Sequence, residues 1–356
     1  MNTLIIPCAG KSTRYPNMKP KWLLTHPDGK LMIEKVIFNL DINKFDRVII
    51  TIVNQHNMNF DAELILNQIF RNKLKDKLEI CVLDAFTSCQ AETVIKTIEI
   101  MSITGNILIK DCDSLIEITD YKLVLNNNFV SGVNINNFKN ENFKLKNKSF
   151  FKIDKEKNIV EIKEKDIVST YISVGFYGFA DAELFLNTYN ILKNNYEGLE
   201  IYISHIIQYL IINNRIKFNY LCVSDYIDWG TADDWYYTIK KHSTYIVDID
   251  GVLVENVGKY GSRNWYNYNV ELKNNLNKIK ELSDNGAQII LLTSRDKKSI
   301  KFIEKIFNIY RIPIHAIITD CNHSCRIIIN DFAFSNPYPS CKAINIPRNA
   351  DINYYI

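Results

Sequence analysis

Short apolar runs and segments with apolar residues at helical spacing alternate along most of this chain. One helical stripe extends from Ala91 to Met101, and a second from Leu272 to Leu282 ends near Gly286, where a helix would stop. Such alternation is typical of α/β proteins with parallel sheets. Runs rich in β-branched residues predict strands at Thr3–Pro7, Arg47–Val53, Leu78–Leu83, Ile107–Lys110, Gln288–Thr293 and Arg326–Ile329.

The length of the chain, 356 residues, predicts two domains at about 150 residues each. No linker rich in proline, glycine or serine divides it, but the pattern restarts with a strand at Thr244–Asp250 that ends in an acidic pair. We therefore expect domains at residues 1–242 and 243–356. The fold class that we expect is α/β, with two Rossmann-like three-layer domains and mostly parallel sheets.

The composition indicates an ordinary folded protein and argues against some partners. Basic residues (43) nearly balance acidic ones (40), so we expect no nucleic acid as a partner. The basic stretch Lys139–Lys165 is interrupted by acidic residues, which favours a solvated hairpin face. No apolar run approaches the roughly 20 residues that cross a bilayer, so we expect no membrane insertion. Eight scattered cysteines without a secretory signal favour the cytoplasm.

A strand that runs into a turn of small residues carries the first candidate site. The turn at residues 10–14 holds two cations, and Lys21 follows a few residues later. Backbone N–H groups in such a turn, beside cations, can cradle phosphates. The turn is not a Walker A loop, because Ile5 stands where that motif requires glycine.

Carboxylates that follow other strands extend this candidate site. Asp111 and Asp113 follow the apolar run at Ile107–Lys110, and Asp228 precedes a Gly-Thr pair. Ligand sites in open α/β sheets lie at the carboxyl ends of strands. Two carboxylates together with phosphate oxygens form a Mg²⁺ site.

These elements, in this order, resemble the sugar-phosphate nucleotidyltransferases over about residues 1–240. In that family a Gly-rich loop ending in Thr-Arg and a later Pro-Lys pair grip a nucleoside triphosphate. The resemblance implies that Arg14 and Lys21 are catalytic residues on the triphosphate. It also implies that Asp113, with Asp111 as the alternative, and Asp228 hold Mg²⁺.

The resemblance further implies residues for the nucleotide and the acceptor. The loop has Ser12 in place of the usual second glycine and is followed by a short segment, as in cytidylyltransferases of isoprenoid and choline-phosphate type. The nucleotide and the acceptor stay open, with CTP or UTP favoured. The implied binding residues are Ala9, Gly10, Lys11, Ser12 and Thr13 for the triphosphate, Gln90 and Glu92 beside the base, and Glu164, Lys165 and Gly175 at the sugar.

The second domain opens with a strand that ends in Asp248 and Asp250. One aspartate of such a pair can attack a phosphorus while the other works as general acid and base. The segment resembles motif one of the haloacid-dehalogenase-like phosphatases, over about residues 244–356 and without room for a large cap. That resemblance implies phosphoryl binding by Thr293 or Ser294, and Mg²⁺ binding by Asp331 with Asp248 and Asp250. The phosphate-binding cation is open between Arg326, Lys297 and Lys298.

The sequence as a whole predicts a bifunctional, Mg²⁺-dependent enzyme. Its first domain would join a nucleoside triphosphate to a phosphorylated sugar or polyol, making a precursor for a surface polysaccharide such as capsule or lipooligosaccharide. Its second domain would dephosphorylate a related metabolite. Two alternatives stay open: a transferase with an inactive docking domain, and a phosphatase with a nucleotide-sensing domain. A homo-oligomer is compatible with either.

Overall fold

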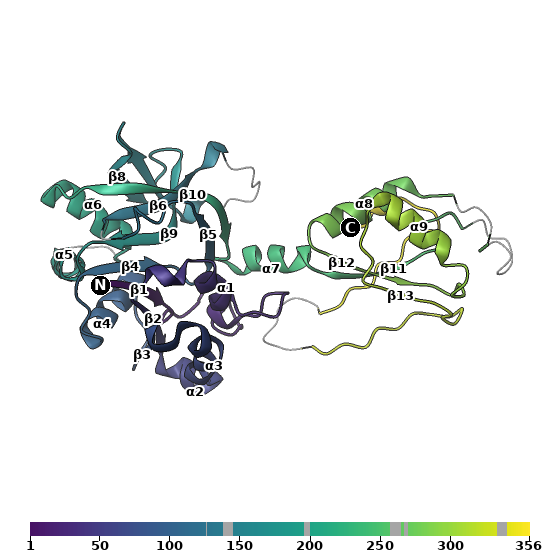
Figure 1. Ribbon diagram of the computed structural model, residues 1–356, viewed down its shortest axis with the longest axis horizontal. Helices are drawn as coiled ribbons and strands as arrows, with labels where there is room; N and C mark the ends of the chain where they lie inside the picture. The colour runs from purple at the N-terminus through teal and green to yellow at the C-terminus, as the bar shows by residue number, and fades with distance from the viewer. Residues whose placement is uncertain (126, 138–144, 196–199, 257–264, 267–269, 333–339) are drawn as a thin grey trace. The chain divides into compact units, whose positions relative to one another are not determined.

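The chain folds into two compact units, Met1–Ala232 and Asp233–Ile356, each with its own sheet (Figure 1). The computed structural model describes residues 1–125, 127–137, 145–195, 200–256, 265–266, 270–332 and 340–356. Both units combine helices with sheets that contain parallel strands, which confirms the predicted α/β fold class. None of the described helices is long and apolar enough to cross a membrane.

The described residues of the first unit form a ten-stranded sheet in the order β3-β2-β1-β4-β9-β6-β10-β8-β7, with β5 paired to β10. The strands β3, β2, β1 and β4 are parallel, and β9 runs antiparallel between β4 and β6. The bounds are Asn2–Pro7 (β1), Arg47–Val53 (β2), Leu78–Leu83 (β3), Asn106–Lys110 (β4), Ser114–Ile118 (β5), Phe129–Asn134 (β6), Ser149–Ile153 (β7), Asn158–Glu164 (β8), Tyr171–Phe179 (β9) and Phe218–Asp228 (β10).

Helices cover both faces of this sheet because its central strands bury side chains on both sides. Leu4 and Ile6 of β1 join one core with α1 and α3, whereas Ile5 joins the other core with α4, α5 and α6. The helices span Met32–Phe38 (α1), Asn54–Phe60 (α2), Ala62–Leu74 (α3), Gln90–Ile100 (α4), Ala182–Asn195 (α5) and Ile203–Asn214 (α6).

The second unit contains a small parallel sheet in the order β11-β12-β13. Its helices α8 and α9 pack into a single core with inward residues of the strands, such as Leu291. On the other face of the sheet, Ile246 and Ile318 are exposed. The elements span Thr244–Asp248 (β11), Gln288–Leu292 (β12), Ala316–Ile318 (β13), Ala232–Lys241 (α7), Lys273–Asp284 (α8) and Lys301–Tyr310 (α9).

The predicted strand at residues 326–329 is wrong. This segment has no strand hydrogen bonding in the structure, and its apolar side chains are exposed, Ile329 to 93%. β-Branched residues favour a strand only when a neighbouring strand pairs with them and their side chains are packed. The described part of the sheet ends at β13 instead, so the apolar run lacks such a partner.

Candidate active site

A cavity of about 760 Å³ lies in the first unit, where the chain leaves β1 and β4. Its walls also include the start of the β7–β8 hairpin and the ends of β8 and β10. The structure brings together most residues assigned to this unit from the sequence: Gly10, Lys11, Ser12, Thr13, Arg14, Lys21, Gln90, Asp113, Glu164, Lys165, Gly175 and Asp228.

Two residues assigned to nucleotide binding do not line this cavity. Ala9 is buried, and its carbonyl oxygen accepts a hydrogen bond from Thr87 N at 3.3 Å. The carboxylate of Glu92 accepts bonds from Ser88 N and Ser88 Oγ at 2.7 and 2.6 Å, and pairs with Lys96. These bonds tie Glu92 to the first turn of α4, where a negative charge also stabilises the helix dipole.

The loop after β1 turns tightly at Ser12. This residue adopts a left-handed conformation (φ 50°), and Tyr15 N donates to Ser12 O at 2.8 Å to close the turn. Glycine adopts this conformation without cost, so serine occupies a position whose geometry favours glycine. The turn leaves Lys11 and Arg14 exposed beside the cavity.

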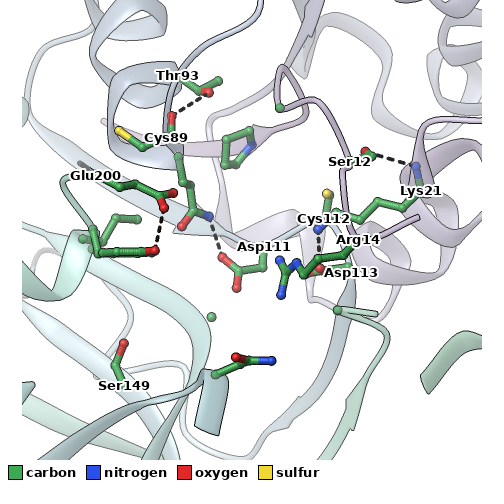
Figure 2. Close-up of a pocket in the computed structure, with 18 of the residues that line it drawn as sticks. Ser12, Arg14, Lys21, Cys89, Thr93, Asp111, Cys112, Asp113, Ser149 and Glu200 are labelled. Carbon is green, nitrogen blue, oxygen red and sulfur yellow. Dashed lines mark hydrogen bonds and ion pairs between the residues drawn. The ribbon is translucent and has the colours of Figure 1, made fainter. Parts of the chain in front are cut away.

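Asp113 lies between β4 and β5, is buried, and forms an ion pair with Lys21. Figure 2 shows Arg14 beside Asp113 in the cavity. Burial alone would raise the pKa of Asp113, but the charges of Lys21 and Arg14 hold this pKa well below its usual range. The reciprocal attraction raises the pKa of Lys21 despite its burial. Both groups are therefore charged at neutral pH.

Asp228, at the end of β10, faces the same space as Asp113. A side-chain carbon built on Gly230 would lie 3.1 Å from Asp228 Oδ1, 3.7 Å from Asp113 Oδ2 and 3.5 Å from Arg14 Nη1. The other carboxylate oxygen of this aspartate, Asp228 Oδ2, accepts a hydrogen bond from Lys148 Nζ at 2.5 Å. Two carboxylates and three cations thus converge on one side of the cavity.

Asp111 has different surroundings from Asp113. Its Oδ1 accepts a hydrogen bond from Gln90 Nε2 at 2.6 Å, and burial together with the charge of Asp113 raises its pKa. A side-chain carbon on Gly175 would lie 2.1 Å from Asp111 Oδ2, and Gly175 has φ +78°. Position 175 therefore requires glycine for two reasons: the close approach of Asp111 and the positive φ of its backbone.

The residues at this site fit a hard divalent cation. No group of three or more His, Cys, Asp or Glu side chains with the arrangement of a metal site occurs among the described residues. Asp113 and Asp228 nevertheless supply two facing carboxylates, the ligand type that Mg²⁺ prefers alongside phosphate oxygens and water. Each carboxylate pairs with a lysine through its Oδ2 atom, so a cation that binds there would compete with an ammonium group.

The opposite wall of the cavity is rich in hydroxyl and carboxylate groups. Glu164 accepts hydrogen bonds from Ser149 Oγ and from Ser204 Oγ. Lys165 Nζ donates to Tyr202 OH at 2.5 Å, and Tyr202 OH donates to Glu200 at 2.5 Å. Groups of this kind bind the hydroxyls of a polar ligand.

Sequence reasoning missed Lys148, Glu200, Tyr202 and Tyr226, which also line the cavity. The stretch from residue 139 to 165 was interpreted as a solvated hairpin face, and that interpretation is wrong for Lys148. Lys152 pairs with Glu161 at the surface, but the Lys148 side chain is only 15% exposed. Its position at the hairpin base, next to Ser149 where β7 begins, was the available signal.

The second unit brings several of its assigned residues near the carboxyl ends of β11 and β12. Arg295, only 2% exposed, donates to Asp250 Oδ2 at 2.9 Å and to Asp250 Oδ1 at 2.6 Å. Thr293 is buried, and Thr293 Oγ1 accepts from Arg295 N at 3.1 Å. Arg326 Nη2 donates to Ser294 Oγ at 3.1 Å. Arg295, which was not assigned a role from the sequence, thus organises this group.

Asp331 does not have the setting that its assignment required. It lies exposed, beyond the segment at residues 326–329 that was expected to form a strand. A strand end would have directed Asp331 toward Asp248, and that strand is not formed. Lys297 and Lys298 are exposed.

Comparison with solved structures shows a shared fold. A nucleoside-diphosphate-sugar pyrophosphorylase from Vibrio cholerae RC9 is 19% identical with a TM-score of 0.55, over 66% of this chain and 99% of that one. An inositol-1-phosphate CTP transferase from T. maritima is 13% identical with a TM-score of 0.51, over 67% and 96%. A protein assigned as a glucose-1-phosphate thymidylyltransferase from Bacillus anthracis, in complex with sucrose, is 17% identical with a TM-score of 0.53, over 67% and 94%. No protein-family model and no curated protein matches the sequence.

Proposed function

We propose that the first unit transfers a nucleotidyl group from a nucleoside triphosphate to the phosphate of a sugar or polyol and releases pyrophosphate. The observation that carries this proposal is the convergence of Asp113 and Asp228 with Arg14 and Lys21 beside a phosphate-binding turn. The names of the three solved structures with this fold describe the same kind of reaction, which supports the proposal. CTP or UTP is the favoured donor, as in the resemblance described above.

The charges of the cavity suit this chemistry. Arg14, Lys21 and the N–H groups of the turn bind the triphosphate, and the hydroxyl-rich wall with Glu164 and Lys165 binds the acceptor. Asp113 and Asp228 would hold Mg²⁺, which offsets negative charge on the phosphates when bound. An acceptor phosphate oxygen forms a bond to the α-phosphorus while the bond to the bridging oxygen breaks. Because pyrophosphate leaves as an anion, the protein supplies position and positive charge and moves no proton.

The setting of this reaction is part of the proposal. A nucleoside diphosphate derivative of a sugar or polyol is an activated donor, and we assign it to the assembly of a surface polysaccharide such as capsule or lipooligosaccharide. Nucleoside triphosphates are cytoplasmic metabolites, so the enzyme would act in the cytoplasm.

Thermal unfolding with Mg²⁺ and each of CTP, UTP, GTP, ATP and dTTP tests the nucleotide site without knowledge of the acceptor. A ligand at 100 times its dissociation constant stabilises a protein by about 2.7 kcal/mol. We expect one or two triphosphates to stabilise the parent chain, and the Lys21→Ala variant to lose this effect. Pyrophosphate release with a panel of sugar 1-phosphates and polyol phosphates then identifies the acceptor. If no triphosphate stabilises the parent chain, the proposal fails.

A second proposed activity belongs to the second unit, which would hydrolyse a phosphate ester. The bidentate pair of Arg295 with Asp250, next to Thr293, favours it because it keeps a buried cation beside Asp248 at the strand ends. Asp248 would attack the phosphorus and the ester oxygen would leave. Water would then cleave the phosphoaspartate, and Mg²⁺ at Asp248 and Asp250 would offset the phosphate charge. The inactive docking unit is the alternative to this activity.

Phosphate release from p-nitrophenyl phosphate with Mg²⁺ decides whether the second unit is a phosphatase or an inactive docking unit. We expect the parent chain to turn over and the Asp248→Asn variant to lose at least 100-fold in rate. Equal rates for the parent and Asp248→Asn would leave only the docking role. The Asp113→Ala variant is the control, because its substitution lies in the other unit and should leave this rate unchanged.

A further inference from the structure

A lysine that no motif singled out lies between the two ends of the cavity. Lys148 immediately precedes β7, and its Nζ donates to Asp228 Oδ2 at 2.5 Å and to Tyr226 OH at 2.6 Å. The side chain is only 15% exposed, although the hairpin that follows it is a surface element. Lys148 therefore holds Asp228, one of the two carboxylates of the candidate metal site.

Each carboxylate of this site pairs with a different lysine. Lys21 pairs with Asp113 from the side of the loop after β1, and Lys148 pairs with Asp228 from the side of the hairpin. A divalent cation that binds between the carboxylates would compete with these ammonium groups, because each lysine occupies the Oδ2 atom of its carboxylate. An ammonium group displaced from its carboxylate, as in Lys148 with only 15% of its side chain exposed, is stabilised by another anion nearby.

The position of Lys148 indicates which anion would replace the Asp228 carboxylate as its partner. Lys165 N donates to Lys148 O at 3.0 Å, so Lys148 is a direct neighbour of the Glu164–Lys165 pair on the wall assigned to the acceptor. The ammonium group of Lys165 donates to Tyr202 OH, and its Nζ atom lies 4.4 Å from the centroid of that ring. The positive charge of Lys148 thus lies at the boundary between Asp228 and the wall assigned to the acceptor.

We propose that Lys148 binds the phosphate group of the acceptor, the group that attacks the α-phosphorus. The inference rests on the transferase function proposed above and adds a catalytic residue to it. In the absence of substrate Lys148 is held by Asp228 and Tyr226, and on binding it exchanges the Asp228 carboxylate for the acceptor phosphate. The reaction must bring two anions together, the acceptor phosphate and the triphosphate, and their repulsion is its main electrostatic obstacle. The positive charge of Lys148 would offset this repulsion.

Binding of inorganic phosphate to the nucleotide complex tests this role without knowledge of the whole acceptor. The full chain is saturated with Mg²⁺ and the α,β-methylene analogue of the triphosphate that stabilises it, and phosphate is then titrated by calorimetry. The variant is Lys148→Gln, because an amide removes the charge while keeping a hydrogen-bond donor for Asp228. The matched control is Lys152→Gln, an exposed lysine four positions along the same hairpin.

We expect Lys148→Gln to bind phosphate about 10- to 100-fold more weakly than the parent, the size of one lost charge-assisted contact. Its affinity for the nucleotide analogue should change by less than about threefold. Lys148→Arg should recover part of the phosphate affinity, and Lys152→Gln should behave like the parent. Retained nucleotide binding also shows that Lys148→Gln is folded.

Three outcomes overturn the role of Lys148. They are equal phosphate affinity in parent and Lys148→Gln, absence of phosphate binding to the parent complex, and an equal loss of nucleotide and phosphate affinity in Lys148→Gln. The transferase function fails by a different result, because it requires nucleotide binding by the parent chain before any phosphate is added.

Discussion

Ser114 lies opposite Asp228 in the antiparallel pairing of β5 with β10. This register brings Asp228 next to Asp113, the residue before Ser114, and Trp229 N donates to Asp113 O at 2.8 Å to fix the contact. Two carboxylates that are more than 100 positions apart in the sequence therefore face each other because of one strand pairing. Their separation depends on the backbone rather than on flexible side chains, as a preorganised site requires.

Lys21 is expected to be required for nucleotide binding because it pairs with Asp113 and lines the cavity with the turn that we propose to bind the triphosphate. Replacement by alanine removes this charge and exposes the triphosphate to an unpaired Asp113 carboxylate. We predict a loss of about 100-fold in nucleotidyl transfer, measured as pyrophosphate release with the acceptor found by the panel. Lys19→Ala is the control, since Lys19 is exposed and does not line the cavity. An active Lys21→Ala enzyme would show that the loop does not bind the triphosphate.

Lys110 supports the turn that carries Asp113. It is fully buried, and its Nζ donates to Ser114 O at 2.8 Å, Ser114 Oγ at 2.6 Å and Asp111 O at 3.1 Å. Lys110→Met removes the ammonium donor from all three of these oxygens, so we predict a loss of about 3 kcal/mol in the stability of the first unit. The measurement is hydrogen exchange of β1 peptides in urea, which reports on this unit alone.

The Lys110→Met variant should also lose nucleotide stabilisation, because the Asp111–Asp113 turn is no longer held. The exposed Lys152→Met substitution is its control and should change stability by less than about 0.5 kcal/mol. Unchanged exchange rates in Lys110→Met would mean that the backbone of the turn is maintained without the ammonium group.

The sequence predicted the buried strands of the first unit well. The bounds of β2 and β3 agree with the predicted runs, because β2 is buried on both faces inside the sheet and β3, at the end of the strand order, pairs with β2 along its whole length. The loop after β1 and the aspartates were likewise visible, since each follows or ends a strand. A site built from strand ends can be located from local sequence in this way.

Other parts of the site depend on contacts that local sequence does not encode. Lys148 reaches Asp228 across 80 positions, and only its place just before β7 distinguishes it from the surface lysine at position 152. The apolar run at residues 326–329 shows the opposite error, because its composition favours a strand but no partner strand is present in the described sheet. In both cases the outcome is decided by distant packing.

His56 should make the first unit less stable in mild acid. It is buried in α2 against the rings of Trp22 and Phe86, and burial lowers its pKa to about 4. Because the unfolded chain binds a proton near pH 6.5 and the folded chain does not, stability is complete above that pH and declines as the pH falls toward 4. We predict a loss of about 2 kcal/mol between pH 7 and pH 5.

Urea unfolding of the first unit at pH 7 and pH 5 measures this decline. The His56→Leu variant, which has no titratable group at this position, should lose most of the difference between the two pH values. An equal pH dependence in parent and variant would assign the decline to other groups.

Gly175 offers a test of the packing around Asp111. Alanine at this position places a carbon 2.1 Å from Asp111 Oδ2 and retains φ +78°, so both overlap and backbone strain act on the variant. Asp111 cannot move aside freely, because Gln90 holds its other oxygen. We predict that Gly175→Ala costs about 3 kcal/mol or more in stability and abolishes nucleotide stabilisation. Gly29→Ala is a matched control: Gly29 has φ +85° but no atom within 4 Å of the added carbon, so strain alone should cost about 1–2 kcal/mol. Equal losses in the two variants would show that the contact with Asp111 is easily relieved, and would remove the packing argument for glycine at position 175.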